Sequence, residues 1–290
     1  MSSEATDWRA YWREVEPQLA AFAAGQRSPE LHAALGDALG FFGFVAERIE
    51  GKASRHAPEQ MKLAPLLTEA LDLLRGIRSG YKAQLLASLA LMARTAFELR
   101  CSVEYLGQSS DVPRLADMFV RFVYAERMKF SRALLTLTKD AAGPLTVEAL
   151  EARRVQAARD EAEARKLAPE WFGADGKLRA DHWTGPGRSI FDMARDADLE
   201  GDYRSLYAST SKFTHGSPLL RSMYVTEGGI GPLAIHSHCS LMATLGALHC
   251  LSLLRAWCEL FAIAWPAKEY PGIRERIQKA ATMISSSGKP

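Results

Sequence analysis

The sequence predicts an all-α fold, a single helical bundle with long apolar core helices and one charged peripheral helix. Of its 290 residues 48% are hydrophobic, Ala and Leu recur at helical spacing, and alternating runs of β-branched residues are few. A chain of this length and apolar content can bury a large core. The 36 basic and 34 acidic side chains leave a formal charge of +2, which excludes a generally polybasic nucleic-acid binder and a highly charged disordered chain.

Helix boundaries follow from capping residues, proline and glycine. Pro29 directly after Ser28 has the pattern of a proline at the first helical position behind an N-cap. Ser189 followed by Asp192 is a capping box that starts a short helix. Further helix ends are marked by Gly107, Gly143 and Gly201. The expected helices cover residues 5–24, 29–52, 60–76, 80–107, 112–139, 146–167, 189–199, 201–214, 233–264 and 271–285.

One segment, Glu148–Lys166, is crowded with charges and has few apolar anchors, so we expect a solvated helix there rather than a partner-binding surface. The turn-rich stretch Pro169–Pro186 follows it, and its large aromatic side chains need a surface to bury against. We expect this stretch to pack onto the bundle without a domain boundary. The aromatic residues are Trp171, Phe172 and Trp183. The expected organisation is N-terminal helices packed on the core over 1–59, a bundle core over 60–265, and a C-terminal helix and tail over 266–290.

The sequence favours a cytoplasmic location without a membrane partner. No apolar core of a signal peptide follows the N-terminus. The uncharged stretch Gly228–Leu254 contains histidines and begins with Gly and Pro, which favours a buried core helix over a bilayer span. The cysteines lack the short spacing of zinc or thioredoxin motifs and are expected to be free buried thiols in a reducing compartment. They are Cys101, Cys239, Cys250 and Cys258.

A charged pair lies within the apolar helix expected over 80–107. Arg94 and Glu98 are four residues apart and therefore share a helix face. Their apolar surroundings predict at least partial burial, and buried charges must satisfy one another. The favoured interpretation is a structural ion pair that fixes helix register, and the alternative is a guanidinium held ready for an anionic ligand.

A second set of polar side chains repeats at steps of four in the helix expected over 201–214. Tyr203, Tyr207, Ser211 and His215 form a stripe along one face. The helix ends at His215, where the helix dipole favours a protonated ring. This composition suits an acid–base site and equally a hydrogen-bonded seam between helices. A histidine at a helix end is more often a cap than a catalyst.

Two other site types are not favoured. The run Gly229–Ala234 resembles a dinucleotide-binding fingerprint but has no βαβ unit around it. His236 and His238 diverge on a helix, and no Glu-x-x-His pair accompanies them. We therefore expect neither a metal nor a cofactor.

Several spaced residues resemble a known family. Arg94 and Glu98 are followed by Trp183, by Ser189 with Met193, and then by the stripe from Tyr203 to His215 with Gly216 and Ser217 after it. This order resembles the all-helical bacterial family called domain of unknown function 5677, over roughly residues 60–265. The resemblance implies a helical bundle and no established activity.

A more distant similarity is to the HEPN superfamily of helical bundles, which includes metal-independent ribonucleases of toxin–antitoxin and phage-defence systems. Their motif, an Arg followed four to six residues later by a His and assembled across a dimer, is not reproduced here. Arg204 lies too far upstream of His215 and Lys212 too close. The one literal match, from Arg27 to His32, crosses a proline at a helix start and is interpreted as accidental.

Two functions remain open, and with them whether the chain is an enzyme. The favoured one is a binding or regulatory module with a buried polar cluster, in which Trp183, Tyr203 and Ser211 are the candidate binding residues. The alternative is a HEPN-like ribonuclease that acts on RNA with Arg94, Glu98, Tyr207 and His215 as catalytic candidates. The natural partner is not specified. A homodimer is one option for long apolar helices, although no heptad register specifies it.

Overall fold

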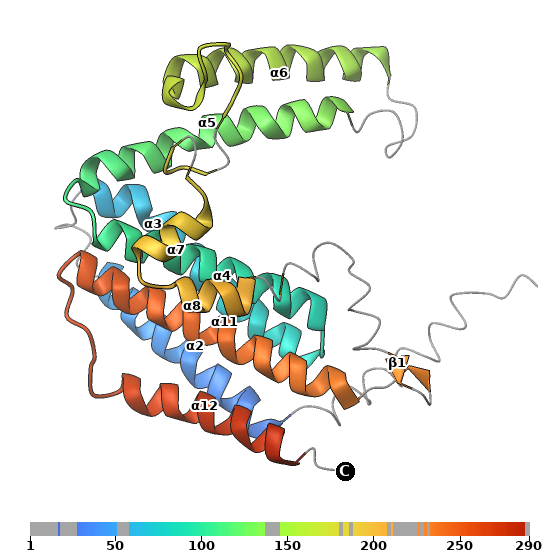
Figure 1. The fold of residues 1–290 in the computed structure, drawn as a ribbon, viewed down its shortest axis with the longest axis vertical. Coiled ribbons are helices and arrows are strands. Elements are labelled where there is room, and N and C mark those ends of the chain that lie inside the picture. The colour runs from blue at the N-terminus through green and yellow to red at the C-terminus, as the bar shows by residue number, and fades with distance from the viewer. Residues whose placement is uncertain are drawn as a thin grey trace, which may run out of the picture. The chain divides into compact units, whose positions relative to one another are not determined.

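The computed structural model confirms the all-α fold (Figure 1). It describes residues 17, 28–50, 58–136, 146–179, 182–185, 188–207, 210, 225–226, 229–230 and 233–287. Apart from Pro17, the helix expected over 5–24 lies outside the described residues. The helices divide between two compact units. Unit 1 comprises Met1–Ser54, Leu66–Glu104 and Leu199–Pro290, and unit 2 comprises Arg55–Pro65 and Tyr105–Asp198.

Unit 1 is built around α11, the long apolar helix Leu233–Leu260, which packs against α2 and α12. By length and composition the stretch Ser237–Leu260 could cross a membrane, but 72% of its most apolar window is buried inside the protein. Burial of this kind is typical of the core helix of a bundle. The elements of unit 1 are α2 (Pro29–Glu50), most of α3 (Pro58–Lys82), most of α4 (Leu86–Gly107), α8 (Glu200–Asp202), the π-helical turn η4 (Tyr203–Tyr207), the antiparallel pair β1 (Val225–Thr226) and β2 (Gly229–Ile230), α11, and α12 (Tyr270–Ser287).

The predicted start of α2 is confirmed. The Ser28 hydroxyl accepts a hydrogen bond from the Leu31 amide at 3.2 Å, so Ser28 caps the helix that Pro29 begins. The Ser28 amide donates to the Tyr81 hydroxyl of α3 at 3.0 Å, and the Ser240 hydroxyl of α11 donates to the same oxygen at 3.4 Å. One fully buried phenol therefore joins three helices of the unit 1 core.

The turn between α3 and α4 lies later than predicted, because α3 continues to Lys82 instead of ending near 76. Gly76 and Gly80 are interior positions where α3 packs closely on α4. A Cβ at Gly76 would lie 2.7 Å from the Met92 sulfur, so a larger residue there would have to displace the Met92 side chain. The chain turns instead at Gln84, whose φ of 53° is left-handed and whose side-chain amide donates to the Tyr81 carbonyl at 2.7 Å.

Unit 2 contains α5 (Val112–Thr136), α6 (Val147–Leu167), the short turn η3 (Pro169–Trp171) and α7 (Ile190–Asp196). The charged segment is α6, which packs along α5 through ion pairs. Asp160 is 1% exposed and accepts hydrogen bonds from Ser131 of α5 and, at 2.8 Å, from Gln156. Arg127 of α5 forms an ion pair with it at 2.8 Å. Burial raises the pKa of Asp160, but these hydrogen bonds and the Arg127 charge outweigh burial and lower it overall.

Of the three loop aromatics after α6, Trp171 and Trp183 are buried, as predicted, and Phe172 is half-buried. Trp171 is fully buried against Phe122 of α5, with ring centroids 5.5 Å apart. Trp183 packs edge-on against Phe119 at 5.8 Å. The capping box predicted at Ser189 also forms, with Asp192 as its partner. Helix α7 ends at Asp196, earlier than predicted, because Asp198 adopts a left-handed φ of 58°.

Candidate functional site

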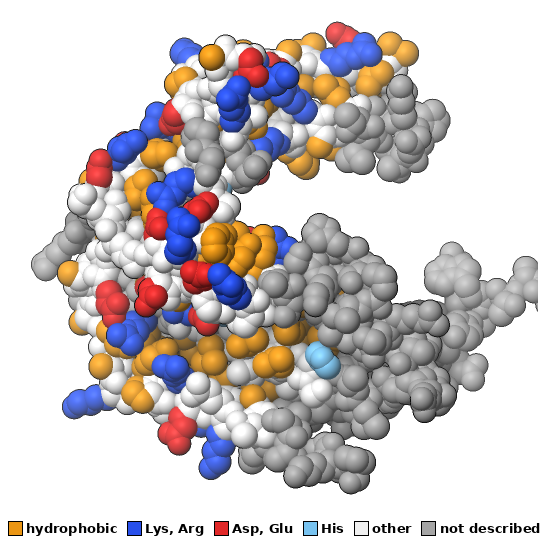
Figure 2. All heavy atoms as spheres, in the orientation of Figure 1, with side chains coloured by type: hydrophobic (Ala, Val, Ile, Leu, Met, Phe, Trp, Pro, Cys, Tyr) orange, Lys and Arg blue, Asp and Glu red, His pale blue; other side chains and the backbone are white. Residues whose placement is uncertain are grey.

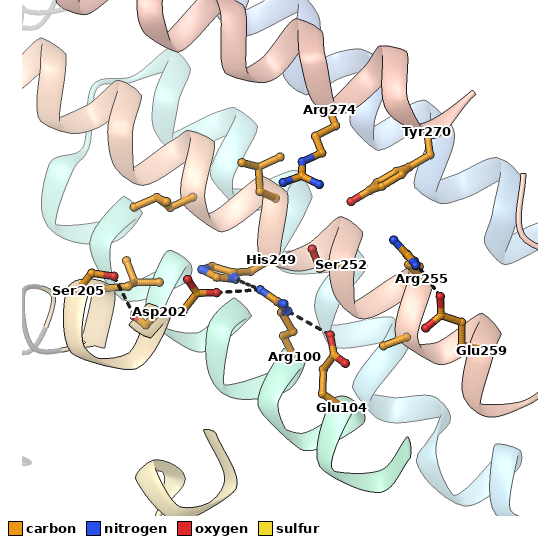
Figure 3. Close-up of a pocket in the computed structure, with 14 residues that line it drawn as sticks. Arg100, Glu104, Asp202, Ser205, His249, Ser252, Arg255, Glu259, Tyr270 and Arg274 are labelled. Atoms are coloured by element: carbon orange, nitrogen blue, oxygen red, sulfur yellow. Dashed lines mark hydrogen bonds and ion pairs between the residues drawn. The ribbon is translucent and has the colours of Figure 1, made fainter. Parts of the chain in front are cut away.

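The candidate site is a cavity of about 450 Å³ within unit 1, lined by α4, α8, η4, α11 and α12 (Figure 3). Cavities of this size hold small organic molecules. Three arginines and three carboxylates line it together with one histidine: Arg100, Arg255, Arg274, Glu104, Asp202, Glu259 and His249.

Arg100 of α4 is held by three neighbours in this cavity. Its Nη1 donates to Asp202 Oδ2 at 3.0 Å and lies 3.3 Å from His249 Nδ1, and its Nε donates to Glu104 Oε1 at 3.3 Å. The side chain is only 18% exposed, so these contacts replace most of its hydration. Arg100 therefore fixes α8 and α11 to α4 at one end of the cavity.

His249 of α11 is held neutral. The residue is 5% exposed, and burial, followed by the nearby Arg100 charge, lowers the pKa of its imidazole to about 4. Because a guanidinium only donates hydrogen bonds, Nδ1 is the acceptor and the ring proton lies on Nε2. At neutral pH this histidine is a hydrogen-bonding group of fixed tautomer.

Other polar side chains of the lining have no hydrogen-bond partner among the described residues. Arg255 pairs with Glu259 at 2.7 Å, whereas the side chains of Arg274 and Tyr270 on α12 have no hydrogen bond or ion pair in the part of the chain that the structure describes. Both side chains extend from α12 toward the cavity (Figure 3). The Ser252 hydroxyl of α11 is likewise unbonded among the described residues. Three hydrogen-bond donors are therefore available to water or to a ligand.

A second polar cluster in unit 1 brings together three of the four predicted catalytic residues. Arg94 Nε donates to Glu98 Oε1 at 3.0 Å, and Arg94 Nη2 donates to the Tyr207 hydroxyl. The guanidinium carbon also lies 4.1 Å from the centre of the Tyr207 ring. Burial, and then the charge of Glu98, raises the pKa of Tyr207. Tyr203, a predicted binding residue, stacks on Tyr207 with ring centroids 4.6 Å apart.

The remaining predicted residues either lie outside the described residues or belong to unit 2. Ser211 and His215 lie outside the described residues. Trp183 belongs to unit 2, where it is 4% exposed and fills space between Tyr105 and Phe119. Within the described ranges, no three His, Cys, Asp or Glu side chains are grouped to hold a metal ion.

Sequence reasoning missed the residues of the cavity. One signal was present, because Arg100 and Glu104 repeat the four-residue spacing of Arg94 and Glu98 only six residues later. His249 was not among the predicted site residues. No sequence signal identified Arg274, because its position over α11 depends on how α12 packs in three dimensions.

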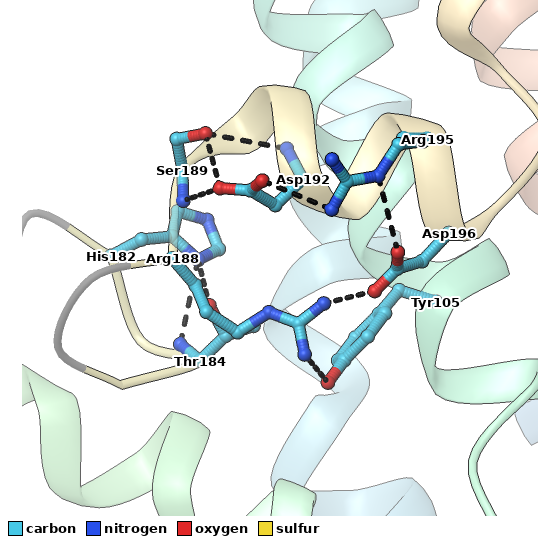
Figure 4. A network of polar contacts seen from close by, with 8 residues as sticks. All are labelled: Tyr105, His182, Thr184, Arg188, Ser189, Asp192, Arg195 and Asp196. Atoms are coloured by element: carbon cyan, nitrogen blue, oxygen red, sulfur yellow. Dashed lines mark hydrogen bonds and ion pairs between the residues drawn. The ribbon is translucent and has the colours of Figure 1, made fainter.

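Unit 2 has a polar network of its own (Figure 4). Arg188 donates to the Tyr105 hydroxyl at 3.3 Å and pairs with Asp196 at the end of α7. Burial lowers the pKa of His182 to about 4, with a further contribution from Lys129, and its Nδ1 accepts from the Thr184 amide at 3.4 Å. These contacts join loop residues to α4 and α7, so we interpret the network as structural.

The comparisons with known proteins identify one family. A family model described as "Family of unknown function (DUF5677)" matches residues 61–231. No curated protein matches the chain, and no solved structure does. The matched region includes the α4 and α8 side of the cavity, whereas α11 and α12 follow it in the sequence.

Proposed function

Since the chain belongs to the DUF5677 family, a family of unknown function, we propose from its site that it is a binding module whose unit 1 cavity takes a small anionic molecule. The observation that carries this proposal is the guanidinium of Arg274 at the cavity, which has no hydrogen bond or ion pair among the described residues. Arginine is the side chain best suited to bind phosphate and carboxylate groups.

The other charges of the lining support an anion at Arg274. Glu104 and Asp202 are both bound to Arg100, and Glu259 is bound to Arg255. With His249 neutral, Arg274 is the one charged group of the described lining that forms no ion pair. The nearby hydroxyls of Tyr270 and Ser252 add donors of the kind that an oxygen-rich anion accepts.

Binding is favoured over acid–base catalysis at this cavity. An efficient general acid or base has a pKa near the working pH, and the pKa of about 4 for His249 is well below neutrality. Arg94 donates hydrogen bonds to both Glu98 and Tyr207, and these bonds suit a structural role in which the cluster holds η4 on α4. The site thus has the attributes of a preformed receptor.

Calorimetric titration with inorganic phosphate tests the proposal. We expect saturable binding to the full chain and an approximately tenfold or larger loss of affinity in Arg274→Gln, which is about 1.4 kcal/mol. Arg276→Gln is the matched control, because Arg276 lies on the same helix but pairs with Asp37 at 3.1 Å. Equal affinities in the two variants, or no binding to the wild type, would refute the proposal.

RNA cleavage is a second candidate function, favoured by one observation. Arg100 and His249 place a guanidinium 3.3 Å from an imidazole, the two groups that would stabilise phosphorane charge and move a proton. Incubation with labelled RNA tests it, with His249→Gln and His215→Ala as separate variants. Cleavage by the wild type that is lost in either variant would support a ribonuclease, and absence of cleavage would leave binding alone.

A further inference from the structure

The exposed face of α11 changes character along its length. The non-buried positions from Leu241 to Glu259 recur at steps of four and three, so they form one stripe along the helix. The first half of the stripe is apolar and the second half is polar. The stripe consists of Leu241, Leu245 and Leu248, followed by Ser252, Arg255 and Glu259.

The cavity includes the point where the stripe changes from apolar to polar. Leu245 and Leu248 line it on the same side as Ser252, and Leu206 of η4 adds a further apolar wall. Figure 2 shows hydrophobic side chains running along α11 beside α8 and α12. Leu241 extends this apolar surface beyond the cavity and is 48% exposed. A wholly hydrophilic anion would leave these leucines in water.

We infer that the ligand is an amphipathic anion, with an oxygen-rich anionic head at Arg274 and an apolar body along the leucines of α11. This inference rests on the proposed function and adds the chemical class of the ligand. The charge complementarity comes from Arg274, and the apolar complementarity comes from Leu245 and Leu248. From Leu241 to Leu248 the helix rises by about 10 Å, which provides a surface for a medium-length alkyl chain or a ring of similar size.

A series of phosphates with a constant head tests the inference on the full chain. The probes are inorganic phosphate, butyl phosphate and octyl phosphate, each titrated by calorimetry below its micelle concentration. Full burial of one methylene strengthens binding by up to about fourfold, so we expect at least a roughly tenfold gain from inorganic to octyl phosphate even with partial burial. Leu248→Ser should remove most of that gain.

The matched control is Leu85→Ser, an exposed leucine directly before α4 and about 22 Å along that helix from Arg100. It should bind octyl phosphate as the wild type does. Circular dichroism verifies that both variants fold, and the chain-length series on the wild type needs no variant.

The outcomes separate the inference from the proposed function. Equal affinity for the three phosphates, with continued dependence on Arg274, would overturn the inference and leave the proposed function standing. No binding of any phosphate, or binding that is unchanged in Arg274→Gln, would overturn both. Co-sedimentation with phosphatidylglycerol vesicles without binding of monomeric octyl phosphate would also overturn the inference, because the ligand would then be a lipid surface.

Discussion

The neutral state of His249 predicts a specific pH dependence of stability. Its pKa is about 4 in the folded protein and about 6.5 in the unfolded chain, so between these values the unfolded state binds more protons. The free energy of unfolding therefore falls as the pH falls from 6.5 toward 4. For a folded pKa of 4 the contribution of His249 to this fall reaches about 2.5 kcal/mol at pH 4.5. It is absent above about pH 7.5.

The variant His249→Gln removes this titration and keeps a side chain that can accept from Arg100. We expect its free energy of unfolding to be lower than that of the wild type at pH 7.5. This gap in stability should narrow by about 2.5 kcal/mol at pH 4.5. Urea unfolding followed by circular dichroism at the two pH values measures the gap. Ser252→Ala on the same helix serves as the control, with a constant gap.

An NMR titration of the His249 ring measures its pKa directly. Arg100→Met removes the positive charge that, after burial, contributes most to the low pKa of His249, and should raise that pKa. Parallel stability profiles for the wild type and His249→Gln, together with a His249 pKa near 6.5, would refute the buried neutral imidazole.

Three further predictions concern contacts within each unit, and urea unfolding measures each of them. Glu98→Ala leaves Arg94 without its carboxylate at a site where the two side chains are 35% and 21% exposed, so we expect a loss of about 1 kcal/mol, and no loss would contradict an ion pair that holds the helix register. Asp160→Ala removes a buried carboxylate that three side chains bind, and should cost about 3 kcal/mol or more, whereas the exposed Glu148→Ala should cost almost nothing. Gly246→Ala places a Cβ 3.2 Å from the Ala93 backbone and should cost about 1–3 kcal/mol of stability. The Cβ of Gly43→Ala meets nothing within 4 Å, so this variant should stabilise α2 by up to about 1 kcal/mol. Equal effects of the two variants would refute the close approach of α11 to α4.

Most helices were predictable because their signals are local. The cap at Ser28 and the capping box at Ser189 depend on residues within one turn, and both form as predicted. The turn between α3 and α4 was misplaced because its cause is tertiary. Gly76 faces Met92 of the next helix, and a sequence pattern does not show which glycine permits close packing and which ends a helix.

Of the two polar sites in unit 1, one was predictable from local patterns and the other depends on tertiary packing. Tyr207 lies 113 positions after Arg94, and the two were assigned to one candidate site because each belongs to a short periodic pattern of polar residues. The cavity was not expected, because it depends on α12 placing Arg274 over the point where the α11 stripe changes from leucine to serine. Such a juxtaposition has no local signature. His215, the fourth predicted catalytic residue, remains a prediction.

The most direct test of anion binding observes the Arg274 side chain itself. The Nε–H signals of arginine can be assigned by comparing the wild type with Arg274→Gln and Arg276→Gln in nitrogen-15 NMR spectra. Addition of phosphate should shift the Arg274 signal saturably and leave the Arg276 signal, from a guanidinium already paired with Asp37, in place. An unmoved Arg274 signal, or equal drifts of the two signals with ionic strength, would contradict a phosphate-binding cavity.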